Sequence, residues 1–179
     1  MIRISKYDPR LVNDIIQFRE DAYTNSGRDP GQVHAWSRDD FDRDATHVVM
    51  FDEDEKIIGV VRIIGGERWT IEDYFHFDYD KRNGVEFGRL AISQMSYNGK
   101  RVISELIKAA CRHCAEEGRT HFYGFVISRL RRELQRMGVP FEVLSPALAP
   151  MGEDSYLIRF KIDEMIHFRG APAAQESER

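Results

Sequence analysis

Residues 85–93 read VEFGRLAIS, and residues 98–118 read NGKRVISELIKAACRHCAEEG. The first segment is rich in apolar and aromatic residues, which favours a strand, and Gly88 in its middle is typical of a bulge or of close approach by another backbone. The second segment predicts a helix over 98–117, with Gly118 as its natural C-terminal stop. The inner face of this helix would be formed by Val102, Leu106, Ala109 and Ala110.

The chain before this pair of segments predicts one more helix and three more strands. A short strand is expected at Ile2–Ser5, and Asp8 with Pro9 is a good helix start. A polar segment over 25–45 follows that helix. Residues 46–64, THVVMFDEDEKIIGVVRII, predict a hairpin because two β-rich runs flank an acidic turn. The apolar stripe of the helix would consist of Leu11, Ile15, Phe18 and Ala22.

The chain after the long helix predicts a strand at 121–128, a helix at 129–137 and two strands at 141–144 and 155–162. The full order is strand, helix, three strands, helix, strand, helix and two strands. This order resembles that of the GNAT acyltransferases, in which a long helix directly follows the fourth strand. The resemblance implies an α/β (α+β) fold with three layers, in which helices flank a mixed, mostly antiparallel central sheet.

The composition predicts one domain. With 179 residues and 42% hydrophobic content, the chain can bury one core and is short for two, so we expect a single domain over 1–166 and a flexible tail over 167–179. The start of the chain lacks the apolar run of a secretory signal, and no run of about 20 apolar residues could span a bilayer. We therefore expect a cytoplasmic protein. The net charge of −4 and the lack of a recognised motif disfavour nucleic-acid binding.

The cysteines and histidines predict no metal site. Cys111 and Cys114 form a lone C-x-x-C inside the predicted helix, and the six histidines include no H-E-x-x-H or i,i+4 pair. Two interpretations of the cysteine pair remain open. One is a metal or redox pair, and the other is two small residues packed within a helix.

The residues at the junction between the fourth strand and its helix indicate which acyl donor the protein would bind. In GNAT enzymes this junction is a Q/R-x-x-G-x-G/A loop whose amides hold the pyrophosphate of coenzyme A. Here residues 96–101 keep Gly99 but place Arg101 at the second small position, which makes an acyl-carrier protein an attractive donor beside acyl-coenzyme A. The donor contacts implied by the resemblance are Ile92, Gly99, Lys100, Arg101 and Arg132.

The charge distribution also bears on the identity of the acyl donor. Residues 100–136 hold nine basic and four acidic side chains, whereas the rest of the chain is acidic. This imbalance is compatible with a docking surface for an acidic carrier protein and equally with solvated helix faces.

A sharper resemblance is to the acyl-homoserine lactone synthases and the related N-acyl amino acid synthases. These enzymes carry an R-x-x-x-F/Y element, a D-x-x-D element, an arginine on the third strand and E-x-S-R on the fourth. No single element is specific, but the matching elements occur in the same order over residues 15–93. They are Arg19 with Tyr23, Asp39 with Asp42, Arg62, Phe75, and Glu86 with Arg89.

Two positions depart from that pattern. The lactone synthases usually place a tryptophan shortly after the R-x-x-x-F element, whereas the nearest tryptophan here is Trp36, and the serine of E-x-S-R is Gly88. These departures leave the wider acyltransferase class in place but do not decide the acceptor, which is either an amino acid or S-adenosylmethionine.

The chemistry of thioester aminolysis assigns roles to the fourth strand. The reaction needs a group that receives the proton of the amine and donors for the developing oxyanion. Because Glu86 and Gly88 alternate onto one face of the strand, we interpret Glu86 as the general base, acting through water, with Arg89 beside it. The amides around Leu90 and Ala91 are candidates for the oxyanion hole. No permanently bound cofactor is expected.

The resemblance also implies an acceptor site formed by charged and aromatic side chains. The charged members would form an ion-pair cluster that orders the N-terminal segment, with some arginines touching the carboxylate of the acceptor. The alternative is that they are purely structural pairs or surface charges. The acceptor residues are Arg19, Tyr23, Trp36, Asp39, Asp42, Arg62 and Phe75.

The aromatic residues of the second half allow two interpretations. They would line a tunnel for the acyl chain, or they would belong to the core, as alternating aromatics in strands usually do. These residues are Phe75, Phe77, Phe122, Tyr123 and Phe125.

Together these features predict an N-acyltransferase. It would transfer a fatty-acyl group from an acyl-carrier-protein or acyl-coenzyme A thioester to the amino group of an amino-acid-type acceptor, giving an N-acyl amino acid or an acyl-homoserine lactone signal. Two alternatives remain, namely an ordinary acetyl-coenzyme A N-acetyltransferase and a non-catalytic GNAT-fold module that binds a ligand.

Overall fold

A computed structural model describes residues 1–6, 8–28, 30–93, 99–145 and 154–168. The elements of the N-terminal half are β1 (Ile2–Ser5), α1 (Pro9–Asn25), α2 (Pro30–Ser37), the 3-10 helix η1 (Asp40–Arg43), β2 (Thr46–Phe51), β3 (Ile57–Ile64) and the 3-10 helix η2 (Thr70–Asp73). Those of the C-terminal half are β4 (Gly84–Ile92), α3 (Gly99–Glu116), β5 (His121–Ile127), α4 (Ser128–Arg136), β6 (Glu142–Val143), β7 (Ser155–Lys161) and α5 (Ile162–His167).

The predicted order of strands and long helices is confirmed, and the long helix predicted over 98–117 is α3. The polar segment over 25–45, for which no element was predicted, contains α2 and η1. The last strand ends at Lys161 instead of residue 162, because the chain continues there as α5. The tail expected from residue 167 lies outside the described residues from position 169 onward.

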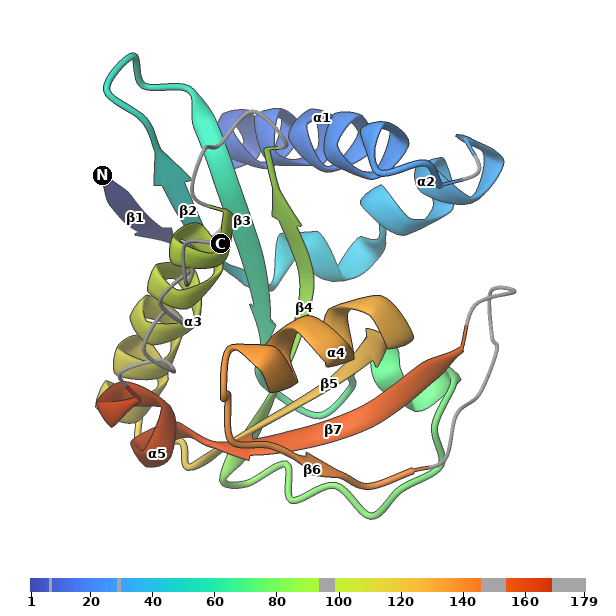
Figure 1. Cartoon of the computed structure of the whole chain (residues 1–179), viewed down its shortest axis with the longest axis vertical. Coiled ribbons are helices and arrows are strands. Elements are labelled where there is room, and N and C mark those ends of the chain that lie inside the picture. The colour runs from blue at the N-terminus through green and yellow to red at the C-terminus, as the bar shows by residue number, and fades with distance from the viewer. Residues whose placement is uncertain (7, 29, 94–98, 146–153, 169–179) are drawn as a thin grey trace, which may run out of the picture.

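The seven strands form one mixed, mostly antiparallel sheet in the order β1-β2-β3-β4-β5-β7-β6. Only the β4–β5 pair among the described strands is parallel. This pair lies in the middle of the sheet, between an N-terminal half of consecutive antiparallel strands and a C-terminal half that contains β7 and β6 (Figure 1).

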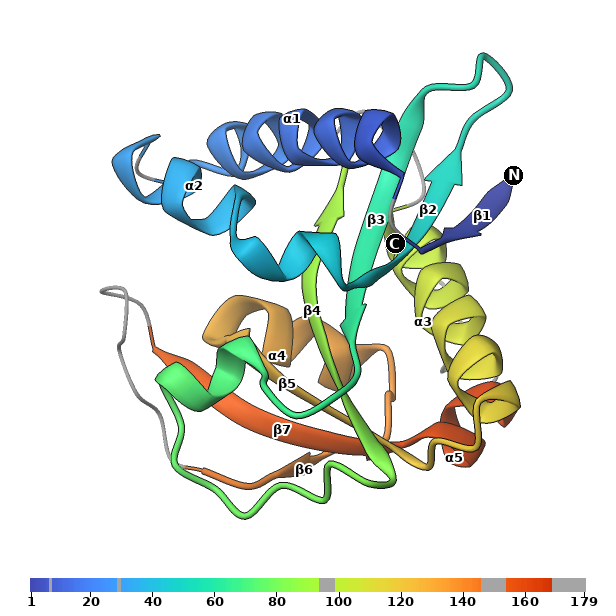
Figure 2. The same ribbon diagram turned by 180° about the vertical axis from the view of Figure 1, so that it is seen from behind.

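Alternating residues of β2 and β3 build the two faces of the sheet. Val48 and Val61 pack in the core cluster that contains the buried face of α3, whereas Val49 and Val60 pack in the cluster that contains the buried face of α1. This is the period of two expected for a strand that is buried on both faces. Helices α1 and α2 cover one face of the N-terminal half and α3 covers the other (Figures 1 and 2), which gives the three layers that were expected.

Strands β4 and β5 separate after a short paired stretch. Their parallel register runs only from Gly84–His121 to Glu86–Tyr123, while β5 stays paired with β7 as far as Ile127. At the point of separation a Cβ atom added to Gly124 would lie 2.5 Å from the carbonyl oxygen of Phe87. The glycine therefore permits the close approach of the two backbones just before they diverge.

No helix in the described part of the chain is long and apolar enough to cross a membrane. The longest, α3, has 18 residues and presents a buried face to the sheet and a charged face to solvent.

We predict that Gly124→Ala lowers the free energy of unfolding by about 1–3 kcal/mol, because the added methyl group meets backbone that cannot rotate away. Gly65→Ala is the matched control, since its Cβ atom would meet only Arg119 Nη2 at 3.6 Å, an ordinary contact. The control should remain within about 0.5 kcal/mol of wild type in chemical denaturation. Equal stability of the two variants would contradict the proposed close approach.

Candidate active site

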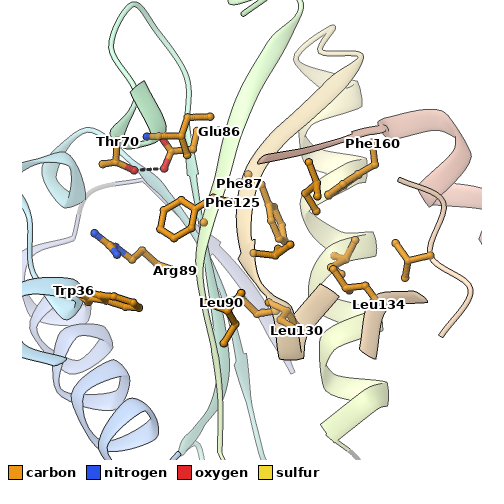
Figure 3. A pocket seen from close by; sticks show the side chains of 18 of the residues that line it. Trp36, Thr70, Glu86, Phe87, Arg89, Leu90, Phe125, Leu130, Leu134 and Phe160 are labelled. Atoms are coloured by element: carbon orange, nitrogen blue, oxygen red, sulfur yellow. Dashed lines mark hydrogen bonds between the residues drawn. The ribbon is translucent and has the colours of Figure 1, made fainter. Parts of the chain in front are cut away.

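A pocket passes through the sheet where β4 and β5 separate (Figure 3). Its polar end lies on the α1–α2 side and is lined by Tyr23, Arg28, Trp36, Thr70, Glu86 and Arg89. Its apolar end lies on the α3–α4 side and is lined by Ile107, Leu130, Leu134, Val139, Ile158 and Phe160. Residues 86–90 of β4 and 124–127 of β5 form the walls between the two ends.

Glu86 lies at the polar end with 2% of its surface exposed. The hydroxyl of Thr70 donates a hydrogen bond to its Oε1 atom, and the backbone amide of Ile71 donates to its Oε2 atom at 3.2 Å. Burial raises the pKa of Glu86, although the hydrogen bond from Thr70 and the positive charge of Arg62 oppose that rise. The site therefore holds a carboxyl group whose proton affinity is higher than that of an exposed glutamate.

A β-bulge follows directly after Gly88, two residues beyond Glu86. Arg62 of β3 pairs with Gly88 and Val60 pairs with Ala91, so Val61 alone faces both Arg89 and Leu90. Arg89 has a φ angle of 55°, which is the left-handed region that residues other than glycine seldom occupy. The strand bends and changes its pairing at the position where the pocket opens.

The two predicted oxyanion candidates differ in position. Leu90 lines the pocket and lies in the bulge, and its carbonyl oxygen is 3.5 Å from the Tyr23 hydroxyl. Ala91 has rejoined the antiparallel register opposite Val60 and is buried beneath α1 and α2. Leu90 is thus the better placed of the two for contact with a bound thioester.

The predicted charged residues meet in one buried cluster. Arg19 Nη1 lies 2.9 Å from Asp42 Oδ1. Arg62 Nη1 lies 2.5 Å from Asp39 Oδ1 and 3.2 Å from Asp42 Oδ1. Arg89 Nη2 lies 2.9 Å from Asp39 Oδ2. The cluster joins α1, the start of η1, β3 and the β4 bulge. The ion pairs exclude isolated surface charges and fit both an acceptor site and purely structural pairs.

The electrostatics of the cluster keep its carboxylates charged. Burial works against the ionised form of Asp42, but the hydrogen bond with His47 and the charges of Arg19 and Arg62 outweigh it, so the pKa of Asp42 lies far below its usual range. Burial likewise opposes ionisation of Asp39, and Arg62 and Arg89 outweigh it to lower its pKa. Burial lowers the pKa of His47, which leaves this ring neutral at pH 7.

Arg28 is a site residue that the sequence analysis missed. Its guanidinium lies between two rings, 4.8 Å from the centre of Tyr23 and 4.7 Å from that of Trp36. In the described part of the chain no carboxylate lies within ion-pair distance of it. Arg89, the other arginine of the lining, pairs with Asp39, which it shares with Arg62. No motif signalled Arg28, because its role depends on two rings that only the fold brings together.

Several predicted contacts lie elsewhere. Phe75, Tyr123 and Phe122 are core residues, and Phe77 is 38% exposed. Phe125 alone among the predicted tunnel aromatics lines the pocket. Phe125 is thus placed where a tunnel residue would be, and the core interpretation is confirmed for Phe75, Phe122 and Tyr123. The apolar end is formed largely by aliphatic residues that sequence patterns cannot distinguish from core.

The predicted donor residues lie around the start of α3 and on α4. Lys100, Arg101 and Arg132 are exposed, and Ile92 packs against the main core. Residues 96–98 of the expected phosphate loop lie outside the described residues, and Gly99 begins α3.

The cysteine pair belongs to the core. Cys111 and Cys114 are free thiols with no exposed surface, and burial raises the pKa of both. The described residues contain no group of three or more His, Cys, Asp and Glu side chains that could hold a metal ion.

The fold and the splayed central strands are those of the GNAT class. The sequence matches the model of the acetyltransferase (GNAT) domain over residues 18–108, which is half of the chain. The protein therefore belongs to the GNAT acetyltransferase domain family. Comparison with curated proteins gives no match.

Solved structures extend the likeness over nearly the whole chain. The AHL synthase LasI superposes with a TM-score of 0.77 at 14% identity, covering 98% of each chain. TofI, solved in a ternary complex with an inhibitor and MTA, gives 0.76 at 16% identity and covers 93% of this chain and 94% of its own. BjaI, a CoA-dependent acyl-homoserine lactone synthase solved with SAM and isopentyl-CoA, gives 0.72 at 14% identity, with 93% and 85% covered. Similarity at these identities establishes the shared fold.

We predict that Asp42→Asn lowers the free energy of unfolding at pH 7 by about 3–5 kcal/mol, because it leaves Arg19 and Arg62 without part of their counter-charge. Since the folded-state pKa of Asp42 is depressed, its contribution is present above the unfolded pKa of about 4 and is lost as pH falls toward the folded value. Denaturation from pH 7 to 3 should show the gap between wild type and variant narrowing. Asp44→Asn is the control, because it alters an exposed carboxylate at the end of η1. It should leave the free energy of unfolding at pH 7 near the wild-type value, and its difference from wild type should not change with pH.

Proposed function

We propose that this GNAT-family protein is an N-acyltransferase that transfers a fatty-acyl group from a carrier-protein or coenzyme A thioester to the amino group of an amino-acid-type acceptor. The observation that carries the proposal is the pocket through the sheet, which has a buried carboxylate at one end and an apolar chamber at the other. The similarity to the AHL synthase LasI and to BjaI supports the same class of reaction.

The apolar end favours a long acyl group over acetyl. Leucine, isoleucine, valine and phenylalanine side chains from α3, α4, β7 and the loop after α4 line it. An acetyl group would occupy only the part near the thioester, whereas an alkyl chain would cover the remaining apolar surface and gain about 0.8 kcal/mol for each buried methylene. An ordinary acetyltransferase remains the alternative, and it predicts a preference for the two-carbon donor.

The polar end favours an acceptor with a carboxylate. Arg28 is half-buried between Tyr23 and Trp36, and no carboxylate of the described residues pairs with it. A partly desolvated cation of this kind is stabilised by a ligand anion. The aromatic rings hold the guanidinium plane in place, which suits the planar recognition of a carboxylate. An α-amino acid held by Arg28 would bring its amino group into the same pocket as Glu86.

The reaction then follows from the positions of these groups. The neutral amine attacks the thioester carbonyl, and Glu86 receives its proton, directly or through water. The amide of Leu90 in the bulge would stabilise the oxyanion. Collapse of the tetrahedral intermediate breaks the carbon–sulfur bond, forms the amide and releases the thiol, which takes up a proton. Closing the product to an acyl-homoserine lactone would need S-adenosylmethionine as the acceptor.

The donor thioester would enter from the side of α3 and α4. Lys100 and Arg101 in the first turn of α3 and Arg132 on α4 are exposed, so they can meet an acidic carrier protein. Arg131 belongs to a different face, because its guanidinium lies 4.2 Å from the ring centre of Tyr156. Rim charges of this kind mainly raise the association rate.

We predict that Glu86→Gln lowers acyl transfer by about 10²-fold, the usual scale for loss of a general base. The test is mass spectrometry of organic extracts from cells that express wild type or variant. Wild type should yield a new N-acyl amino acid or acyl-homoserine lactone, and the variant should yield almost none. Glu53→Gln changes an exposed glutamate in the β2–β3 turn and should match wild type. Equal product from Glu86→Gln would exclude Glu86 as the base.

We also predict that Arg28→Gln raises the KM for a carboxylate acceptor by about 10- to 100-fold, as expected for loss of one charge-assisted hydrogen-bonded pair. The measurement compares the acceptor found in the extracts with its methyl ester, which lacks the charge. The variant should discriminate less between the two than wild type does. Arg3→Gln is the matched control, because Arg3 also lies over a ring, that of Phe51, but far from the pocket.

A further inference from the structure

The carboxylate of Glu86 is held by two donors from a single turn. The Thr70 hydroxyl binds one of its oxygens and the Ile71 amide binds the other. Thr70 and Ile71 also line the pocket, so this turn lies at the wall that a bound acceptor would touch. Figure 3 shows the Thr70 side chain pointing at Glu86 from η2, across from Arg89 and Trp36. An ionised carboxylate has about four lone-pair positions, so each oxygen can accept one further bond from the pocket.

We propose that Thr70 is a positioning residue for the base Glu86: its hydroxyl orients the carboxylate toward the pocket and favours its ionised form. The inference rests on the proposed function, because it requires Glu86 to accept a proton. No covalent step is added, since the proton of the amine goes to Glu86 and the proton of Thr70 stays on its Oγ1 atom.

The need for such a residue follows from burial. Removal from water disfavours a charged carboxylate, and burial raises the pKa of Glu86. A protonated glutamate cannot serve as a base, so the donors that face it decide how much of it is available near neutral pH. The hydroxyl of Thr70, the charge of Arg62 and the amides of Ile71 and Thr70 are the groups that oppose the effect of burial. Among them, the Thr70 hydroxyl is the one that can be removed without altering the backbone or the ion-pair cluster.

The segment around Thr70 is fixed by aromatic packing, a hydrogen bond and an ion pair. Trp69 has no exposed surface and packs against Tyr79 and Tyr123 with ring centres 5.4 and 5.6 Å away. Glu72 accepts a hydrogen bond from the Trp69 amide at 2.7 Å and pairs with Lys81 Nζ at 2.6 Å. The first turn of η2 is thus fixed on both sides, which keeps the Thr70 hydroxyl in one position relative to Glu86.

A purely structural role for Thr70 makes a different prediction from a positioning role. If the hydroxyl only satisfied a buried polar group, its loss would lower stability and leave the titration of Glu86 and the pH dependence of the reaction unchanged. If it favours the ionised form, its loss must raise the pKa of Glu86 and shift the acidic limb of activity to higher pH. Thr70→Val preserves shape and removes the hydroxyl, and Thr70→Ser preserves the hydroxyl. Thr70→Ala replaces Thr70→Val if valine prevents folding.

The first experiment titrates the Glu86 carboxyl by ¹³C NMR of glutamate-labelled protein, with the resonance assigned by its loss in Glu86→Gln. We expect Thr70→Val to raise the measured pKa by about one pH unit, the size of one hydrogen bond to a charged group, and Thr70→Ser to leave it near wild type. An unchanged value in Thr70→Val would overturn the inference. This readout needs no substrate and is independent of the proposed function.

The second experiment measures acyl transfer from octanoyl-coenzyme A to a mixture of the common amino acids, with product detected by mass spectrometry from pH 6 to 9. The rate of Thr70→Val relative to wild type should fall as pH is lowered and return toward unity as pH is raised, whereas Thr70→Ser should track wild type. A ratio that does not vary with pH would overturn the positioning role even if the NMR shift were found. Absence of acylated product from wild type would instead overturn the proposed function, a result that leaves the NMR comparison of Thr70→Val with wild type unaffected.

Discussion

The pairing of three arginines with two aspartates is the interaction on which the arrangement of the site depends. Arg19 and Arg62 are almost completely buried, and a buried guanidinium is tolerated only when a carboxylate faces it. Asp39 and Asp42 supply that charge from the short η1 turn. Because the partners come from α1, β3 and β4, the N-terminal segment can dock on the sheet in only one way. The wall of the pocket that carries Tyr23 and Trp36 is fixed by the same pairing.

Charge compensation within the cluster is incomplete. Asp39 binds both Arg62 and Arg89, and Asp42 binds Arg19 and Arg62, so three arginines share two aspartates and the cluster keeps one positive charge. Arg28 has only aromatic contacts in the described residues, and Glu86 accepts hydrogen bonds from uncharged donors. The charged side chains that line the polar end are therefore Arg28, Glu86 and Arg89, of which Arg89 is only partly compensated by the shared Asp39.

The sequence predicted those elements whose formation depends on residues that are near one another in the chain. Period-two runs and an amphipathic segment ended by glycine located the strands and α3, and η1 was missed because its order comes from ion pairs with distant residues. Helix α2 has little apolar periodicity, and α5 has only six residues and packs on α3. The motif resemblance brought together Arg19, Asp39, Asp42, Arg62 and Arg89 in advance. Thr70 and Arg28 could not be found in this way, since their partners are fixed only by tertiary packing.

The bulge in β4 explains how one strand serves both ends of the pocket. In a regular strand, Glu86 and Arg89 would point to opposite faces, because they are an odd number of residues apart. The left-handed conformation of Arg89 inserts an extra residue, so Arg89 reaches Asp39 and Ala91 packs beneath α1, on the face that carries Glu86. Phe87, Leu90 and Ile92 instead pack toward α3. The spacing E-x-x-R thus gives two residues of one polar site only on a bulged strand. The bulge lies just beyond the last β4–β5 pair, Glu86 with Tyr123, where β4 lines the pocket.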